Sequence, residues 1–410
     1  MNTDASSATV QSSSRAPASA ALWVLVALFV LGLASLVYGL NNETVRPDFA
    51  LFTASLLFLM GVSQTGVVFC AITRIVRAQW AKPYYRLAEL STLAFLPFAF
   101  LGFLLMVVYG RDELFYWLAP AGDEHLSPWL NIRWLLVRDL FGLLLFYGLA
   151  AVYVLKGLRP DLANGAAVDH RQTERQLYAL SPLVILAFVL CNTFFAWDFA
   201  MMLTPHWHST VFPIFFWFSN ILAGTAALIV FPALLTGGAS LTTAEGSFFG
   251  PLQIRYLGRV VHCFILIWLY FFWAQFFVIW FGNLPHEQEP LWRQMYGHYS
   301  PYYWTMMAGC FFIPFATLVF ASIKGSLVSL CVIGFGINLG VWLSKYLMIV
   351  PVFSADDTPF DHWLDLSLSV GLLAGFLALL IAFSRRLPLY SYWEMDLTPE
   401  SRGHKVKEPQ

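Results

Sequence analysis

Residues 194–213 carry the side chains of this sequence that are best suited to chemistry. The stretch reads FFAWDFAMMLTPHWHSTVFP and places Asp198, His206 and His208 between two long apolar runs. A carboxylate and two imidazoles can exchange protons near neutral pH, or they can ligate a metal. Ionisable groups at a membrane boundary usually serve a function, so this stretch predicts a proton-handling or ligand-binding corner.

The composition indicates a protein that lies in a lipid bilayer. Of the 410 residues, 59% are hydrophobic and only 11% are charged, whereas soluble domains carry roughly 25% charged residues. The formal net charge of −1 excludes a nucleic acid held by bulk electrostatics. The five cysteines are scattered through apolar runs without a CxxC pair, which predicts neither an iron–sulfur cluster nor a disulfide framework.

The chain contains ten apolar runs of suitable length, since a spanning helix needs about 20 residues. They lie near 21–40, 51–73, 88–109, 132–155, 178–200, 211–236, 257–282, 302–323, 326–352 and 364–384. We therefore predict an all-α integral membrane protein with about ten transmembrane helices, all in one domain over residues 21–384. No clear cleavage site ends the first run, so it is interpreted as a helix rather than a signal peptide. Residues 1–20 predict a disordered cytoplasmic N-tail, and residues 385–410 a cytoplasmic C-tail.

The basic residues predict the orientation. Seventeen of the 23 Lys and Arg residues fall on the side of both chain ends, and four fall in the opposite loops. Those opposite loops are rich in Asp and Glu. Because positive charge is enriched on the cytoplasmic side of membrane proteins, we expect a multi-pass protein with both termini in the cytoplasm. Asp198, His206 and His208 then lie at the outer face.

Ionisable residues inside the predicted spans gather toward that outer face. Arg138 and Asp139 lie about two turns into the fourth helix after Asn131, and Lys345 lies about two turns from the outer end of the ninth. A charge at the centre of an isolated helix costs about 2.5–3.5 kcal/mol, so each needs a partner. We expect these charged groups to pair with one another and with Asp198. The alternative is a purely structural ion-pair network, or long cations that reach the interface.

A second, weaker set of polar residues lies toward the cytoplasm. Glu89 opens the third helix, Gln64 lies near the middle of the second, and His262 lies about a turn and a half into the seventh. They predict a proton-uptake path with Glu89 at its mouth, because a carboxylate can exchange protons with bulk water. The simpler alternative is an interfacial ion pair between Glu89 and Arg86.

Haem and metal are not predicted for this chain. Axial haem ligation needs histidines that face each other at depth, and His262 alone lies clearly inside a span. The pair His206 and His208 beside Asp198 is a weak metal pattern. A bound quinone headgroup or a proton path explains these residues better.

Five segments together resemble one family of membrane proteins. Residues 198–210, DFAMMLTPHWHST, are similar to the signature D-W-x-M-S-L-x-P-H-W-x-S-T of quinol:cytochrome c oxidoreductase (alternative complex III) membrane subunits, which belong to the NrfD-like, polysulfide-reductase-anchor family. Four further segments are similar in the same order: FLMGVSQTGVVFCAI (58–72) followed by RAQWAKPYYRLAE (77–89), WLNIRWLLVRDLF (129–141), the helix and loop at 257–287, and WLSKYLMIVPVFS (342–354).

The resemblance implies an architecture and a set of partners. It implies two four-helix bundles with two flanking helices, in the bacterial inner membrane. The chain length favours the shorter F-type subunit. The partners implied are multihaem cytochrome c subunits, an iron–sulfur subunit and a second NrfD-like subunit, and the substrate is menaquinol or ubiquinol. No haem or iron–sulfur cluster is expected in this chain itself.

The sequence departs from the family pattern at several acidic positions. The acid–base pair of the ninth helix is Ser344-Lys345 here, and the acid before the seventh-helix L-G-K is Tyr256. In the signature, Met202 replaces a serine and Thr204 replaces an acid. Three hypotheses remain: a subunit that binds quinol at the outer face, a structural or proton-conducting subunit whose paralogous partner binds quinol, or a stand-alone secondary transporter.

Overall fold

The computed structural model describes residues 19–42, 49–118, 127–162, 168–204, 207–235, 250–354, 358, 361–389, 391, 393 and 394. Within these ranges every regular element is a helix, and nine helices are long and apolar enough to cross a bilayer. They are α2 (Ser19–Asn41), α3 (Phe49–Ile75), α4 (Lys82–Val108), α6 (Ile132–Leu162), α7 (His170–Ala196), α8 (Phe212–Leu235), α10 (Pro251–Gly282), α15 (Leu327–Phe353) and α16 (Trp363–Arg386). The predicted all-α membrane fold is confirmed.

The predicted span at 302–323 is not one continuous α-helix. It consists of α12 (Ser300–Met307), a π-helical turn (Ala308–Phe312), α13 (Ile313–Leu318) and, after a bend, α14 (Ala321–Lys324). Proline lacks the N–H that an α-helix interior requires, and Pro314 is the second residue after the π turn. Gly309 packs so tightly on α15 that a Cβ atom there would lie 2.7 Å from the Gly336 carbonyl oxygen.

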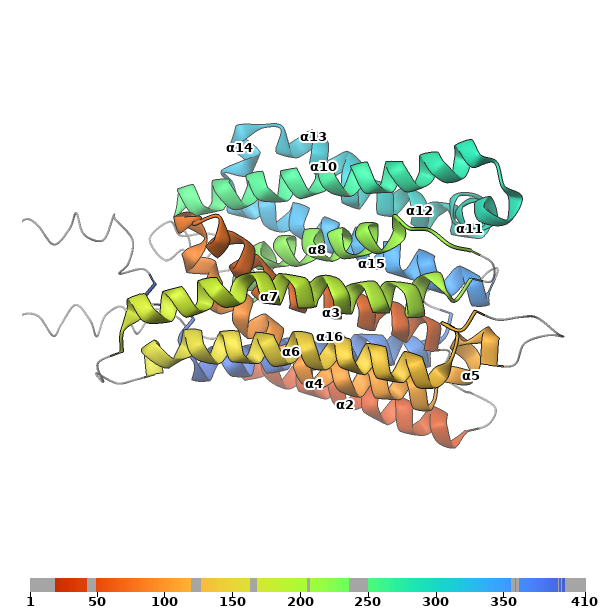
Figure 1. Cartoon of the computed structure of the whole chain (residues 1–410), viewed down its shortest axis with the longest axis horizontal. Coiled ribbons are helices and arrows are strands. Elements are labelled where there is room, and N and C mark those ends of the chain that lie inside the picture. Colours follow the sequence, from red (N-terminus) through yellow and green to blue (C-terminus); the bar gives the residue numbers. More distant parts are fainter. Residues whose placement is uncertain are drawn as a thin grey trace, which may run out of the picture.

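The long helices pack as two bundles and a flanking pair (Figure 1). The first bundle contains α3, α4, α6 and α7, and the second contains α8, α10, α15 and the broken α12–α13. The flanking helices α2 and α16 pack closely on each other, and α16 also packs on α4 and α3. Close approach is possible because Gly32 faces Gly371, where a Cβ atom would lie 2.9 Å from the Gly371 Cα.

Helix α3 lies at the centre of the molecule. It packs on α4 and α7 of the first bundle and on α8 and α15 of the second, and nearly all of its residues are buried. By contrast, α10 exposes a row of large side chains, including Tyr270, Trp273 and Phe281, as expected for a helix that faces lipid. Polar side chains next to α3 therefore lie inside protein, where they need protein partners.

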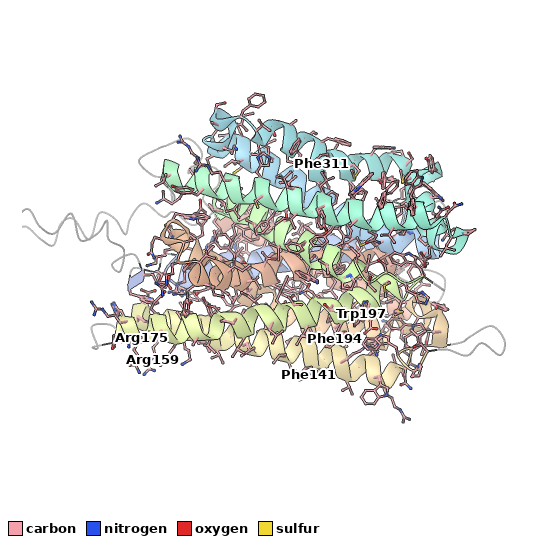
Figure 2. The ribbon with its side chains drawn as sticks, turned by 45° about the horizontal axis from the view of Figure 1, so that its top comes forward. Phe141, Arg159, Arg175, Phe194, Trp197 and Phe311 are labelled. Carbon is pink, nitrogen blue, oxygen red and sulfur yellow. The ribbon has the colours of Figure 1, made fainter. Side chains whose placement is uncertain are left out.

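The two ends of the bundle differ in their side chains. We call the end where α2 begins and α16 ends the terminal face, and the other end the opposite face. Figure 2 shows Arg159 and Arg175 together at one end and Trp197 near the other. The short helices α5 (Arg111–Leu114) and α11 (Pro285–Met295) lie at the opposite face (Figure 1).

Candidate functional site

An arginine–aspartate pair joins α6 to the end of α7 at the opposite face. Asp198 lies in a π-helical turn, Trp197–Met201, in which the Met202 amide donates to the Trp197 carbonyl oxygen at 2.7 Å. The Arg138 Nε donates to Asp198 Oδ2 at 2.5 Å, and Arg138 Nη2 donates to Asp198 Oδ1. Both side chains are largely buried, so the two hydrogen bonds of this ion pair take the place of hydration for both charges. The expected pairing of these two residues is present.

Trp129 supplies a third hydrogen bond to the Asp198 carboxylate. Its indole Nε1 donates to Asp198 Oδ1 at 2.9 Å, and its carbonyl oxygen accepts from Arg138 Nη1 at 2.9 Å. The Arg138 guanidinium carbon also lies 4.0 Å from the centroid of the Trp129 ring, a cation–π geometry. Trp129 was not among the site residues predicted from the sequence, although it stands nine residues before Arg138 in the segment that resembles the family.

Asp139 lies beside this pair and is fully buried. Among the described residues, neither of its carboxyl oxygens accepts a hydrogen bond from a donor. Asp139 is close enough to Asp198 and Arg138 for their charges to act on it. Two neighbouring carboxylates repel each other unless one of them carries a proton. Arg138, Asp139 and Asp198, which we call the outer cluster, therefore reach charge balance with one bound proton.

Other residues predicted for this corner lie elsewhere or serve the helix. Asn131 is exposed, and its Oδ1 accepts from the Arg133 amide at 2.9 Å, so it caps the start of α6 rather than facing Asp198. His208 is exposed to the surroundings of the protein. His206 lies outside the described residues.

Lys345 does not join the outer cluster, which corrects the expected pairing. It is fully buried in α15, where its Nζ donates to the Phe216 carbonyl oxygen at 3.4 Å and lies 3.1 Å from the centroid of the Phe216 ring. Within the described part of the chain, no carboxylate lies within ion-pair distance of it. The reason is position, because α15 belongs to the second bundle while Arg138 and Asp139 lie on α6 of the first.

A chain of amides crosses the middle of the protein. Asn220 of α8 donates from Nδ2 to Asn192 Oδ1 at 2.7 Å, and Asn192 of α7 donates from Nδ2 to Gln64 Oε1 at 2.7 Å. The Gln64 Nε2 donates to Cys191 Sγ at 3.7 Å. Cys191 in turn is close enough to Asp139 to interact with its charge. Gln64 thus lies between the amide chain and the outer cluster.

Hydroxyl groups extend this chain toward α4 and the terminal face. Tyr147 of α6 hydrogen-bonds with Ser63 at 3.5 Å, and Thr92 Oγ1 donates to the Ser63 carbonyl oxygen at 2.5 Å. All three residues are fully buried. Thr92 lies one helical turn along α4 from Glu89.

Glu89 is buried rather than exposed at an interface. Helix α4 begins at Lys82, about two turns earlier than expected, so Glu89 lies inside the helix and is 2% exposed. Arg86 donates from Nη1 to Glu89 Oε2 at 2.8 Å and pairs through Nη2 with Asp161. The predicted Arg86–Glu89 pair is present, but Glu89 is not the mouth that contacts bulk water.

Arg74 forms a second ion-pair centre beside Arg86. It pairs through Nη1 with Glu174 and donates from Nη2 to Glu394 Oε1 at 2.5 Å. Its Nε donates to the Tyr153 hydroxyl at 2.9 Å. We call the charged groups around Arg74 and Arg86 the terminal cluster, and its members are Arg74, Lys82, Arg86, Glu89, Asp161, Glu174 and Glu394. The pattern of basic residues near the ends of the spans was visible in the sequence, but the carboxylates that meet them were not.

His262 does not belong to the terminal cluster. It lies on α10 of the second bundle, where its Nδ1 is 3.0 Å from the Leu318 carbonyl oxygen and its ring packs edge-on against Phe315. His262 therefore hydrogen-bonds with a carbonyl group at the end of α13, where a helix leaves its last carbonyl groups without partners of their own. The structure separates it from Glu89 and Gln64, with which the sequence analysis grouped it.

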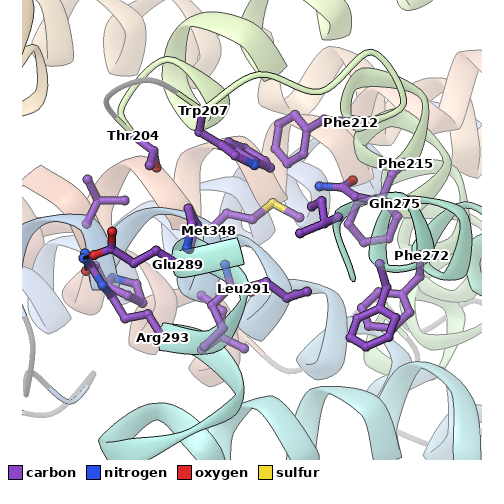
Figure 3. A pocket seen from close by; sticks show the side chains of 17 residues that line it. Thr204, Trp207, Phe212, Phe215, Phe272, Gln275, Glu289, Leu291, Arg293 and Met348 are labelled. Carbon is purple, nitrogen blue, oxygen red and sulfur yellow. Dashed lines mark hydrogen bonds and ion pairs between the residues drawn. The ribbon is translucent and has the colours of Figure 1, made fainter. Parts of the chain in front are cut away.

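A cavity of about 390 Å³ lies at the opposite face of the second bundle (Figure 3). Its walls include the rings of Phe212, Phe215 and Phe272, and α11 contributes Leu291. Figure 3 shows the Trp207 indole among these rings, on the stretch that follows Asp198. This volume falls within the range of small-molecule sites.

Two buried polar atoms line this cavity without a protein partner. Trp207 is nine-tenths buried, and among the described residues its Nε1 finds no acceptor. Gln275 Oε1 likewise finds no donor there. At the rim, Arg293 donates from Nη2 to Glu289 Oε1 at 2.6 Å. A donor and an acceptor on aromatic walls suit a flat ligand with a carbonyl or hydroxyl group.

No protein-family model and no curated protein matches this chain. In the part of the chain that the structure describes, no group of three or more His, Cys, Asp or Glu side chains is placed to hold a metal ion. The arrangement supplies acid–base groups at both ends of one bundle and a separate aromatic cavity.

Proposed function

We propose that this chain conducts protons across the membrane through its first bundle, as one membrane subunit of a quinol:cytochrome c oxidoreductase. The terminal face is assigned to the cytoplasm, which the asymmetry of Lys and Arg supports. The sequence resemblance supports membership of the complex, with multihaem cytochrome c, iron–sulfur and second NrfD-like subunits as partners. The proton role rests on the geometry.

The single observation that carries the proton role is a cluster of buried carboxyl groups at each end of the first bundle. In the outer cluster two aspartates share one arginine. In the terminal cluster four carboxylates and three cations form one network, and Arg77 and Arg175 line the pocket beside it. The carboxylates are Glu89, Asp161, Glu174 and Glu394, and the cations are Arg74, Lys82 and Arg86. Because an unbalanced buried charge is costly, the outer cluster favours one bound proton, and the buried carboxyl groups of the terminal cluster are the groups that can exchange protons at the other end.

The polar groups between the clusters span a distance close to the thickness of a bilayer. On α6, Asp139, Tyr147, Tyr153 and Asp161 follow one another toward the terminal face. The rise of about 1.5 Å per residue separates Asp139 from Asp161 by about 33 Å, and the hydrocarbon core is about 30 Å thick. Between them the amides of Gln64 and Asn192 donate and accept hydrogen bonds at once, which suits them to orient water along a path.

The second bundle lacks these acid–base groups. No Asp or Glu occurs in α8, α10, α12, α13 or α15. Its buried cation, Lys345, contacts a carbonyl and a ring rather than a carboxylate. The two bundles therefore differ in chemistry, and proton transfer is assigned to the first.

The test is proton flux in liposomes that contain the full chain. A potassium gradient with valinomycin drives protons inward, and a trapped pH dye reports their arrival. Asp139→Asn removes a buried carboxyl group of the outer cluster that can bind a proton, so flux is expected to fall on the order of 100-fold. Asp365→Asn is the matched control, because Asp365 is also a buried aspartate but lies on α16 outside the first bundle. Equal flux in both variants would refute the proposal.

The cavity around Trp207 favours a second function, the binding of a quinol headgroup. The Asp198 carboxylate already accepts from Arg138 and Trp129, so the cavity fits such a ligand better than the outer cluster does. Trp207 Nε1 would donate to a carbonyl oxygen of the ring, and Gln275 Oε1 would accept from a hydroxyl. In the purified complex, Trp207→Phe keeps the ring and removes the donor. Quinol oxidation with an unchanged KM in that variant would exclude the cavity as the headgroup site.

Copurification separates this proposal from a stand-alone transporter. A subunit of the complex isolated through an affinity tag on this chain should bring haem-bearing partners with it. A preparation that contains this chain alone and still moves a solute would favour the transporter.

A further inference from the structure

Ser391, Trp393 and Glu394 lie at the terminal end of the first bundle. They follow α16 in the chain, yet their hydrogen bonds are with α3, α4 and α6, and the Trp393 ring lies beside His170 of α7. Trp393 Nε1 donates to the Gly157 carbonyl oxygen at 3.0 Å, and Arg86 Nη2 donates to Ser391 Oγ at 3.4 Å. Ser391, Trp393 and Glu394 are each at most 3% exposed. The predicted C-tail is therefore part of the packed protein at these positions.

Glu394 reaches the centre of the terminal cluster. Its Oε1 accepts from Arg74 Nη2 at 2.5 Å, and its carbonyl oxygen accepts from Lys82 Nζ at 3.1 Å. Its charge also interacts with Glu89, the carboxylate next along the path. Among the described residues, Glu394 Oε2 is buried and accepts no hydrogen bond.

The segment has an attachment to α6 that does not involve the Glu394 carboxyl group. The Trp393 ring and its indole hydrogen bond already attach the segment to α6. Burying a further carboxylate with one oxygen unpaired is unfavourable unless that oxygen carries a proton. The Oε2 atom of Glu394 is therefore available to bind a proton next to Arg74.

Glu394 and Glu174 both pair with Arg74, but they differ in burial. Of the four carboxylates, Glu174 is the most exposed, with 32% of its side chain accessible, so water can stabilise its charge. Glu394 has no such access.

We propose that Glu394, delivered by the C-terminal segment, is the group that takes up a proton at the terminal face and passes it toward Glu89. This inference rests on the proposed proton path. The charged and titratable groups around it are Arg74, Arg77, Lys82, Arg86, Glu89, Asp161, Glu174, Arg175, Cys70, Tyr85, Tyr153 and, through its contact with Trp393, His170.

The first experiment compares Glu394→Gln with Glu174→Gln in the liposome flux assay. Both variants remove one carboxylate that pairs with Arg74, and they differ in burial. Glu394→Gln should lower flux on the order of 100-fold, Glu394→Asp should restore most of it, and Glu174→Gln should change it less than about twofold. Equal flux in Glu394→Gln and wild type would overturn the inference. If Asp139→Asn still abolished flux, the proton path itself would stand.

The second experiment uses the unaltered chain and so does not depend on a variant that folds. Dicyclohexylcarbodiimide adds the O–H of a protonated, buried carboxyl group across its C=N bond, and the adduct rearranges to a stable N-acylurea. Mass spectrometry of the labelled protein should place the adduct on Glu394 and not on Glu174. An adduct on Glu89 or Asp161 with none on Glu394 would assign the proton to another carboxyl group and overturn the inference.

Discussion

Replacing Arg138 by methionine tests whether the outer cluster is held by charge. The variant removes both charged hydrogen bonds to Asp198 and leaves two buried carboxyl groups without a cation. Removing one partner of a buried ion pair costs about 3–5 kcal/mol. The remaining carboxylate can escape this cost by taking up a second proton. Protonating an ordinary aspartate with a pKa of about 3.9 costs about 4 kcal/mol at pH 7 and about 1.5 kcal/mol at pH 5.

The loss of stability in Arg138→Met should therefore shrink as the pH falls. Near neutral pH the folded variant binds two protons more than its unfolded chain, and folded wild type binds one more, so the stability of the variant decreases more steeply as pH rises. Titration with sodium dodecyl sulfate in mixed micelles measures the free energy of unfolding at pH 7 and at pH 5. We expect losses of about 4 and about 1.5 kcal/mol relative to wild type.

Arg133→Met is the matched control for this measurement. Arg133 lies on the same helix, one turn and a half earlier, and is exposed. Its replacement should change the free energy of unfolding by no more than about 0.5 kcal/mol. The reasoning would be refuted if Arg138→Met lowered the free energy of unfolding by less than 1 kcal/mol. It would also be refuted if the decrease were equal at both pH values, because proton uptake would then not limit the loss of stability.

Three further substitutions test the packing around α3, the buried lysine and the cavity. Gly61→Ala should destabilise the protein by about 1–3 kcal/mol in the same titration, because the new Cβ would lie 2.3 Å from Asn220 Cγ. Gly148→Ala is the control, since a Cβ atom at that position would have no neighbour within 4 Å. Lys345→Met should raise the free energy of unfolding by roughly 1 kcal/mol, since it removes a buried charge without a carboxylate partner. A lower stability of that variant would reveal a partner for the ammonium group. Trp207→Phe should leave stability within about 1 kcal/mol, because its Nε1 has no acceptor among the described residues.

The amino-acid sequence determined the membrane fold and much of its outline. Runs of about 20 apolar residues can only cross a bilayer as helices, because lipid offers no hydrogen bonds to a backbone. The same logic identified Asp198, Arg138, Asp139 and Glu89, since an ionisable group inside such a run is costly wherever it lies. The hydropathy pattern predicted one continuous helix at 302–323, because hydropathy does not distinguish a π-helical turn from an α-helix.

Only the tertiary structure decided which of these groups meet. Lys345 and Asp139 lie at similar depths in their helices, but the two helices belong to different bundles, and depth along the chain does not specify the neighbour across a helix interface. The partners Trp129 and Glu394 come from segments outside the spans, where apolar periodicity carries no information. Glu394 lies 320 residues from Arg74 in the chain and is bonded to it in the structure. Pairing of buried charges is set by which helix faces pack together, and that packing exists only in the folded protein.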